Sequence, residues 1–162
     1  KIGKRNTFFI TIPLSIIGYA LKWIGYSPEH PYLLLIAAPF ITFGLGSLFT
    51  LMSSMVADVC DLDELTSDTR REGMFGAVYW WMVKLGTSLA LFLSGVILSA
   101  IGFNQNVEVQ NPHTITYLRL ADIIIPSLAG IFAIIIMWNY DITEKKAREI
   151  RQTLVERRGE LK

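Results

Sequence analysis

The sequence has few of the residues that build disulfide frameworks and metal sites. It contains one cysteine, Cys60, so an intramolecular disulfide is excluded. Its two histidines, His30 and His113, lie far apart in turn-forming segments, which argues against a shared metal site. Charged residues make up only 18% of the chain and hydrophobic residues 52%. The charges are confined to the ends and one internal loop, whereas a soluble domain alternates apolar and polar positions, so the composition predicts an all-α membrane protein.

Four apolar runs predict four transmembrane helices, at about 7–25, 32–57, 76–102 and 121–140. These runs have about the length, ~20 residues, that a helix needs to cross the hydrocarbon core of a bilayer. Strands are excluded because they rarely exceed about ten residues. The second run contains several small residues, which favour either close helix packing or a face turned toward a solute: Gly44, Gly46, Ser47, Ser53 and Ser54.

The distribution of basic residues predicts the orientation of these helices. With four spans, both termini and the loop between the second and third spans lie on one side of the membrane. All of the 15 Lys and Arg residues lie on that side except Lys22, Lys84 and Arg119. By the positive-inside rule, that side is cytoplasmic, as in the inner membrane of a bacterium.

Residues 1–140 therefore form the predicted membrane unit, and residues 141–162 form a predicted cytoplasmic tail. Asp141 and Glu144 have the spacing of an N-cap residue and its N3 partner. Ala147, Ile150 and Leu154 fall on one helical face among basic residues, which is typical of an amphipathic helix that lies on the inner leaflet. Membrane lipid is the expected partner of this helix. The chain opens on a basic segment, without Met or a signal peptide, and we expect it to be part of a longer protein.

Lys84 is the one charge inside the third apolar run. At the helical rise it lies ~17 Å from Gly73, where the uncharged stretch before it begins. A charge at this depth costs ~2.5 kcal/mol or more unless it faces a partner or water. The chain offers no acidic residue inside its other three apolar runs, the fourth being counted from Ile123 to Tyr140. Lys84 therefore pairs with a carboxylate outside this chain, lines an aqueous cavity or is neutral; the alternative is that it lies near the end of its helix.

Aromatic residues accompany Lys84. Tyr79 and Trp80 lie one helical turn before Val83 and Lys84, so the four form two stacked i, i+4 pairs. Aromatic rings beside a cation are suited to stacking on the apolar face of a sugar, whereas ordinary packing or contact with lipid is the alternative. These four residues are the candidate transport pathway; Trp81 points elsewhere on the helix and is interpreted as structural.

A charged segment at 58–73 connects the second and third spans. Its acids could bind Mg²⁺, but the Ala-Arg and later paired aspartates of the CDP-alcohol phosphotransferase pattern are absent, and we predict neither a metal site nor catalytic residues. We interpret the segment as a cytoplasmic hinge whose ion pairs break and re-form as the protein changes conformation. The candidate gate residues are Asp58, Asp61, Glu64, Arg70, Arg71 and Glu72.

Residues 57–73, ADVCDLDELTSDTRREG, resemble the cytoplasmic loop between the tenth and eleventh helices of the glycoside–pentoside–hexuronide:cation symporters. These are the relatives of melibiose permease within the major facilitator superfamily. Leu62 replaces a tyrosine of this loop, and Ser67-Asp68 replaces Thr-Gly. The following MVKLGTSLA resembles the eleventh helix, whose lysine projects toward the cation and sugar sites, and Lys84 falls on that lysine. The residues that match the loop are Asp58, Asp61, Glu64, Arg71, Glu72 and Gly73.

The resemblance implies symport of a sugar or glycoside with Na⁺, H⁺ or Li⁺ by alternating access, and no enzymatic activity. It places the chain at helices nine to twelve plus the tail. Most cation-coordinating and sugar-binding acids of the family lie in the first six helices, so those helices are the expected partner, and no other cofactor and no nucleic acid is implied. The aromatic residues 79–81 keep open a related transporter of a lysolipid or nucleoside. A self-contained four-helix membrane enzyme or assembly subunit is the third hypothesis.

Overall fold

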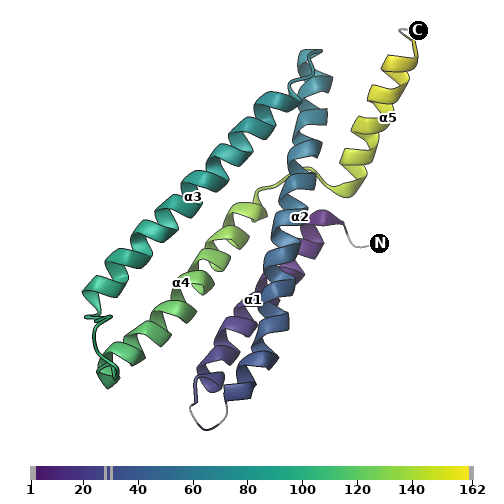
Figure 1. Ribbon diagram of the computed structural model, residues 1–162. Coiled ribbons are helices and arrows are strands. Elements are labelled where there is room, and N and C mark those ends of the chain that lie inside the picture. Colours follow the sequence, from purple (N-terminus) through teal and green to yellow (C-terminus); the bar gives the residue numbers. More distant parts are fainter. Residues whose placement is uncertain (1–2, 28, 30, 161–162) are drawn as a thin grey trace.

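The computed structural model describes residues 3–27, 29 and 31–160, and this part of the chain is built from helices (Figure 1). Four of its helical segments are long and apolar enough to cross a membrane. The elements are α1 (Lys4–Gly25), the short 3₁₀ helix η1 (Pro31–Leu33), α2 (Leu34–Ser67), α3 (Glu72–Ala100), α4 (Pro112–Trp138) and α5 (Glu144–Glu160).

The helix α2 extends well beyond its apolar part, so the predicted loop at 58–73 is wrong over most of its length. The helix continues past Ala57 to Ser67, and only residues 68–71 separate it from α3. Asp68 ends α2 in the left-handed conformation, with φ 53°. The segment between Ala57 and Ser67 contains neither Gly nor Pro, so hydropathy marks where the membrane ends and not where the helix ends.

The helix α4 also begins earlier than predicted, at Pro112 and not at 121. The side chain of Asn111 accepts a hydrogen bond of 3.0 Å from the backbone N–H of His113, and Pro112 occupies the first helical turn. Asn is favourable at the N-cap because its side chain accepts a hydrogen bond from a first-turn N–H that has no partner within the helix. Pro is favourable just inside the helix because it has no N–H to leave unpaired there. The early start adds a polar beginning to the apolar span.

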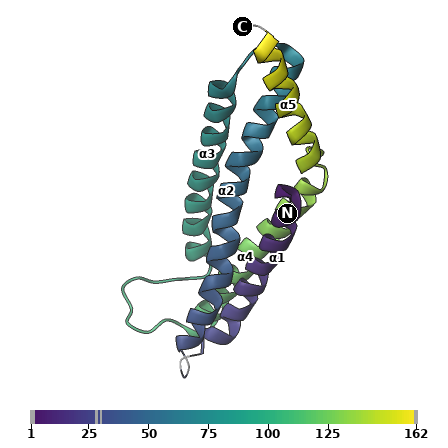
Figure 2. The same cartoon turned by 90° about the vertical axis from the view of Figure 1, so that its right-hand side faces the viewer.

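The first two helices form an antiparallel hairpin, and α4 packs against α1 (Figures 1 and 2). Phe8 and Ile12 of α1, Met55 of α2 and Met137 of α4 form the buried core of this group. A Cβ at Gly18 would come within 3.0 Å of Phe40 and Ile41 on α2. Small residues let membrane helices approach closely, and here they set the distance between α1 and α2.

The helix α3 is the least enclosed of the long helices. None of its residues is buried. Figure 1 shows that it meets α2 at their connecting turn and diverges from it along its length. The apolar side chains that cover α3 are therefore free to contact lipid or helices outside this chain.

The tail helix α5 packs on the far end of α2. Ala147, Ile150 and Leu154 are all buried there, so the predicted placement of this face on the leaflet is wrong for this structure. The cap at its start also differs from the prediction: Lys146 N–H donates to the Thr143 hydroxyl at 3.3 Å, and Glu144 is the first helical residue. Thr143, and not Asp141, is the capping residue.

Candidate functional site

Asp58 is the centre of a charged cluster where α1, α2 and α5 meet. It is only 2% exposed. Lys4 Nζ contacts its Oδ2 at 2.6 Å, and Arg151 Nη2 contacts its Oδ1 at 2.5 Å. A buried carboxylate is unfavourable unless such partners compensate its lost hydration. Asp58 thus ties the beginning of α1 and the tail helix to α2.

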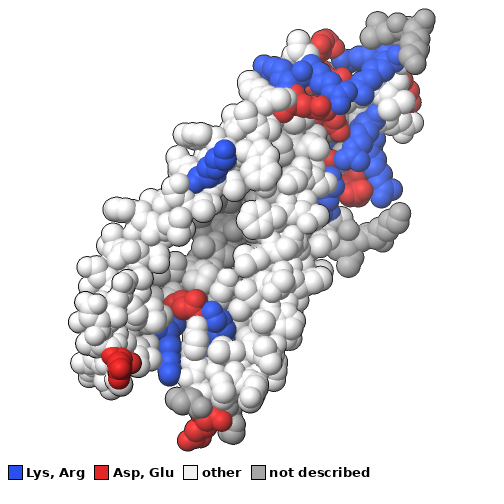
Figure 3. Space-filling view, in the orientation of Figure 1, with Lys and Arg blue, Asp and Glu red and all other residues white. Residues whose placement is uncertain are grey.

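The other acids of α2 also pair with α5. Arg151 Nε lies 3.3 Å from Asp61 Oδ2, and Arg158 Nη2 lies 2.6 Å and 2.7 Å from the two oxygens of Glu64. Arg157 pairs with Asp68. The hydrogen bond to Asp58 is the largest cause that raises the pKa of Arg151. Figure 3 shows these charges gathered over α5 and the adjoining end of α2, while the middle of this face is almost uncharged.

The turn between α2 and α3 has ion pairs of its own. Arg71 donates two hydrogen bonds to Asp63, from Nε to Oδ2 at 2.9 Å and from Nη2 to Oδ1 at 2.5 Å. Arg70 Nη2 contacts Glu72 Oε1 at 2.5 Å. The hydrogen bond to Asp63 raises the pKa of Arg71. All six predicted gate residues take part in ion pairs, and their role as a gate stays a prediction. The sequence analysis missed that three of the paired cations, Arg151, Arg157 and Arg158, come from α5, about 90 residues away. Within the described residues no group of acids, His and Cys is arranged to hold a metal ion.

Tyr140, just after α4, lies beside this cluster with its hydroxyl buried. Among the described residues that hydroxyl has no hydrogen-bond partner. Burial raises the pKa of Tyr140 to about 12, and the negative charge of Asp58 acts in the same direction. The hydroxyl is therefore a neutral, unsatisfied polar group at physiological pH.

Lys84 lies in the interior of α3, ~18 Å along the helix from Glu72. It is exposed, and no hydrogen bond or salt bridge to another described residue satisfies it. It borders a hollow with Trp81, Leu85, Ser88 and Leu89. Met82, two residues earlier, faces α2 and α4, and two residues turn a helix by ~200°, so Lys84 points to the opposite side.

The four candidate pathway residues divide between faces of α3. Tyr79 lines an apolar cavity of about 360 Å³ with Met55, Val59 and Met137 of α2 and α4. Trp80 is 59% exposed, and its ring meets that of Tyr79 edge to face, with centroids 5.4 Å apart. Val83 is partly buried. Trp81, interpreted as structural from the sequence, is the aromatic residue that shares the hollow of Lys84.

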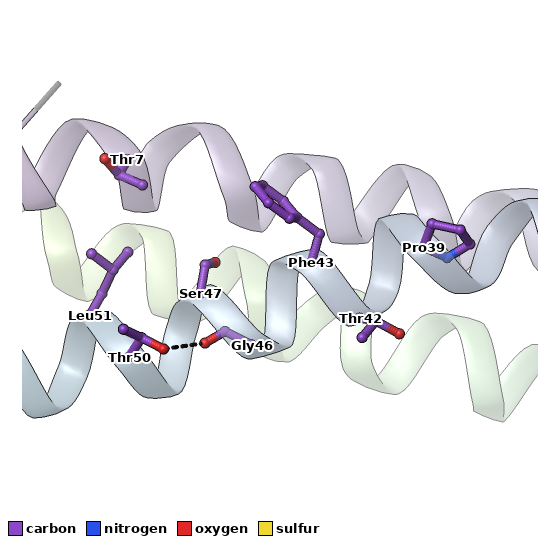
Figure 4. Close-up of a pocket in the computed structure, with 8 residues that line it drawn as sticks. All are labelled: Thr7, Pro39, Thr42, Phe43, Gly46, Ser47, Thr50 and Leu51. Atoms are coloured by element: carbon purple, nitrogen blue, oxygen red, sulfur yellow. Dashed lines mark hydrogen bonds between the residues drawn. The ribbon is translucent and has the colours of Figure 1, made fainter. Parts of the chain in front are cut away.

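The small residues of α2 also divide between two roles. Gly44 packs against Ser15 and Thr11 of α1, whereas Gly46 has open space around it. Gly46 lies in an open hollow of about 680 Å³. Several hydroxyl-bearing residues line it (Figure 4). The residues around it are Thr7, Pro39, Thr42, Phe43, Ser47, Thr50 and Leu51. The helix thus packs against α1 on one side and leaves the hollow around Gly46 uncovered on the other.

A second charged cluster, which the sequence analysis missed, lies toward the opposite end of the helices. Lys22 of α1 pairs with Asp122 of α4, and the hydroxyl of Tyr26 donates to the same carboxylate. Arg119 stacks over the ring of Tyr26 at 5.6 Å. The pair joins two helices whose residues are 100 apart in the sequence. The available signal was one lysine and one aspartate at the edges of two apolar runs.

Comparison with known proteins identifies the family. The family described as "MFS/sugar transport protein" matches residues 1–144. The chain belongs to this family. MFS/sugar transport proteins are membrane transporters and not enzymes, so the chain is part of an integral membrane protein and the hypothesis of a membrane enzyme is excluded. The resemblance drawn from residues 57–73 and Lys84 is confirmed at the level of the family.

Curated relatives of this chain carry the names of carriers and transporters. The chain is 30% identical over 151 residues to the glucuronide carrier protein homolog of Escherichia coli, covering 93% of this chain and 32% of the carrier. It is 33% identical over 158 residues to the uncharacterized symporter sll1374 of Synechocystis, covering 94% and 29%. It is 26% identical over 148 residues to the isoprimeverose transporter of Lactiplantibacillus pentosus, covering 90% and 31%. The chain thus spans about a third of the length of these relatives.

Proposed function

We propose that this chain contributes the last four of twelve helices to a symporter that moves a sugar or glycoside together with Na⁺ or H⁺ by alternating access. In this arrangement α1 to α4 are helices nine to twelve. The proposal rests on the family match across all four helices, together with relatives about three times as long that include named sugar carriers. The remaining helices of the transporter are the expected partner of α2 and α3.

We place the end with the Asp58 cluster and α5 at the cytoplasmic face of a bacterial inner membrane. Nearly all basic residues lie at this end, and the positive-inside rule assigns it to the cytoplasm. The Lys22–Asp122 cluster then lies toward the outer face.

The solute pathway is proposed on the uncovered faces of α2 and α3. Lys84 and Trp80 occupy the side of α3 away from α2 and α4, and the hollow around Gly46 occupies an open side of α2. A cation inside a membrane is stabilised by a carboxylate or by water. Lys84 would find its carboxylate on helices outside this chain. Those helices would also supply most of the ligands of the coupling cation. The acids around Asp58 would act as the cytoplasmic gate, pairing and separating as the two halves of the transporter rock.

The test is uptake of labelled glycosides and pentosides into vesicles that carry the full-length transporter, with and without an imposed Na⁺ or H⁺ gradient. Accumulation of one sugar driven by one gradient is the expected result and names the coupling ion. Absence of uptake of any sugar by folded protein would overturn the sugar proposal. The same panel then includes lysolipids and nucleosides, because the exposed aromatic residues Trp80 and Trp81 suit a flat or apolar solute.

A further inference from the structure

The carboxylate of Asp58 is fully occupied in this structure. One oxygen contacts Lys4 and the other contacts Arg151, and the side chain is 2% exposed. A cation from elsewhere in a transporter cannot reach Asp58 unless one of these partners leaves. Lys4 belongs to α1, whose packing on α2 and α4 forms the core of the protein. Arg151 belongs to α5, whose main packing contact is with α2. Arg151 is therefore the partner that can leave.

A small apolar contact and several exposed ion pairs hold α5 on α2, and such an attachment can be reversed. Its apolar contact consists chiefly of Ala147, Ile150 and Leu154. The side chains of Arg151 and Arg158 are 51% and 46% exposed, and ion pairs of such exposed cations are individually weak. The connection to α4, residues 139–143, is not helical. The carbonyl of Trp138 accepts a hydrogen bond of 2.9 Å from Arg5, so the end of α4 is held independently of α5.

We propose that α5 is a displaceable latch on the acids at the end of α2. Docked α5 occupies Asp58, Asp61 and Glu64 with arginines from the same chain. Released α5 leaves these carboxylates open to cations of the remaining helices, and that pairing closes the cytoplasmic side. The occupation of the acids by α5 stands on the contacts alone, whereas the consequence for gating rests on the function proposed above.

The docking is tested by hydrogen exchange of the amides of residues 147–154 in the full-length transporter in lipid nanodiscs. Arg158→Glu places two carboxylates against each other and is expected to speed exchange by roughly tenfold, the factor that corresponds to ~1.4 kcal/mol. The double variant Glu64→Arg with Arg158→Glu restores an opposite-charge pair and should restore slow exchange. Arg148→Glu is the matched control, because among the residues that the structure describes Arg148 pairs with Glu144 on α5 itself and with no acid of α2.

The charge exchange separates docking on α2 from docking on lipid. A helix held by an anionic bilayer would lose protection in Arg158→Glu and would not regain it in the double variant. Failure of the double variant to restore protection overturns the latch, and so does equal loss of protection in Arg148→Glu.

The effect on gating is tested with Thr50→Cys in a Cys60→Ala background. A membrane-impermeant thiol reagent labels this variant from the cytoplasmic side in inverted vesicles. Arg151→Gln frees Asp58 and Asp61 and is expected to lower the labelling rate severalfold, while Arg148→Gln leaves it unchanged. Labelling of Arg151→Gln at the parent rate overturns the latch while leaving symport intact. A parent that takes up no solute overturns the proposed function, but the exchange measurement still decides whether α5 docks on these acids.

Discussion

Gly44 of α2 lies directly against Ser15 of α1. A Cβ at Gly44 would come within 2.9 Å of the Ser15 Oγ and of the Thr11 carbonyl oxygen, and closer still to the Ser15 Cβ. The Ser15 hydroxyl donates to the Ile12 carbonyl at 2.8 Å, so its side chain is held in place. The two helices therefore meet at a point where only glycine fits.

Substitution of this glycine should weaken the α1–α2 hairpin. We expect Gly44→Ala to destabilise the protein by about 1–3 kcal/mol, as overpacking of a close contact does. Thermal unfolding of the full-length transporter in detergent measures the effect. Gly46→Ala is the matched control, two residues away on the same helix with nothing near its Cβ position, and should change stability little. Equal effects of the two variants would show that the contact with Ser15 does not decide the outcome, because helix propensity alone favours Ala over Gly at both positions.

The Lys22–Asp122 pair should hold α1 and α4 together at the end away from α5. The side chains are 20% and 42% exposed, so the pair lies between the buried and the surface extremes. We expect Asp122→Asn to cost about 1–2 kcal/mol in unfolding free energy, and the exchanged pair Lys22→Asp with Asp122→Lys to recover part of it. Glu72→Gln, which breaks the exposed pair with Arg70, is the control and should cost less. The decisive measurement is whether the exchanged pair recovers unfolding free energy, because a purely steric role for Asp122 predicts no recovery.

Lys84→Ala should abolish coupled uptake by the full-length transporter without unfolding it. The side chain is exposed on α3 and forms no hydrogen bond or salt bridge with another described residue, so its removal breaks no such contact. Uptake is expected to fall to the level of vesicles without protein, while the melting temperature stays within a few degrees of the parent, as for surface substitutions. Lys145→Ala changes another lysine, in the tail, which is 88% exposed, and serves as the control. Uptake at the parent rate in Lys84→Ala would remove this lysine from the mechanism.

The raised pKa of Tyr140 predicts that the protein loses stability at alkaline pH. Its pKa is raised from 10.0 to about 12, so the folded protein holds the phenol proton more tightly than the unfolded chain. This contribution is fully present below pH 10 and is lost as the pH rises from 10 to about 12. Tyr140→Phe removes it and should flatten the decline of the melting temperature over that window.

The same variant should not destabilise the protein near neutral pH. The Tyr140 hydroxyl is buried without a partner among the described residues, and an unsatisfied hydroxyl costs ~1–3 kcal/mol that phenylalanine avoids. Tyr32→Phe is the control, at a site that is 80% exposed. A large loss of stability in Tyr140→Phe at pH 7 would reveal a partner that the described residues do not supply.

The membrane class, the number of spanning helices and the separation of charge were predictable from the sequence. Each depends on local properties: the length of an apolar run, the absence of charge within it and the basic residues at its ends. Helix ends were less predictable. The helix α2 continues to Ser67 and α4 begins at Pro112, because hydrogen bonding along the backbone does not stop where hydropathy does.

Pairings between distant residues required the tertiary structure. Arg158 and Glu64, or Lys22 and Asp122, are about 90 to 100 residues apart, and their meeting depends on how whole helices pack. Local patterns make α5 amphipathic, but its apolar face suits a bilayer and the end of α2 equally well. Hydropathy likewise marks Lys84 as an anomaly in an apolar helix, while the turn of α3 against α2 and α4 determines which way it points. A side chain's type is a local property, whereas its partner is a property of the packed chain.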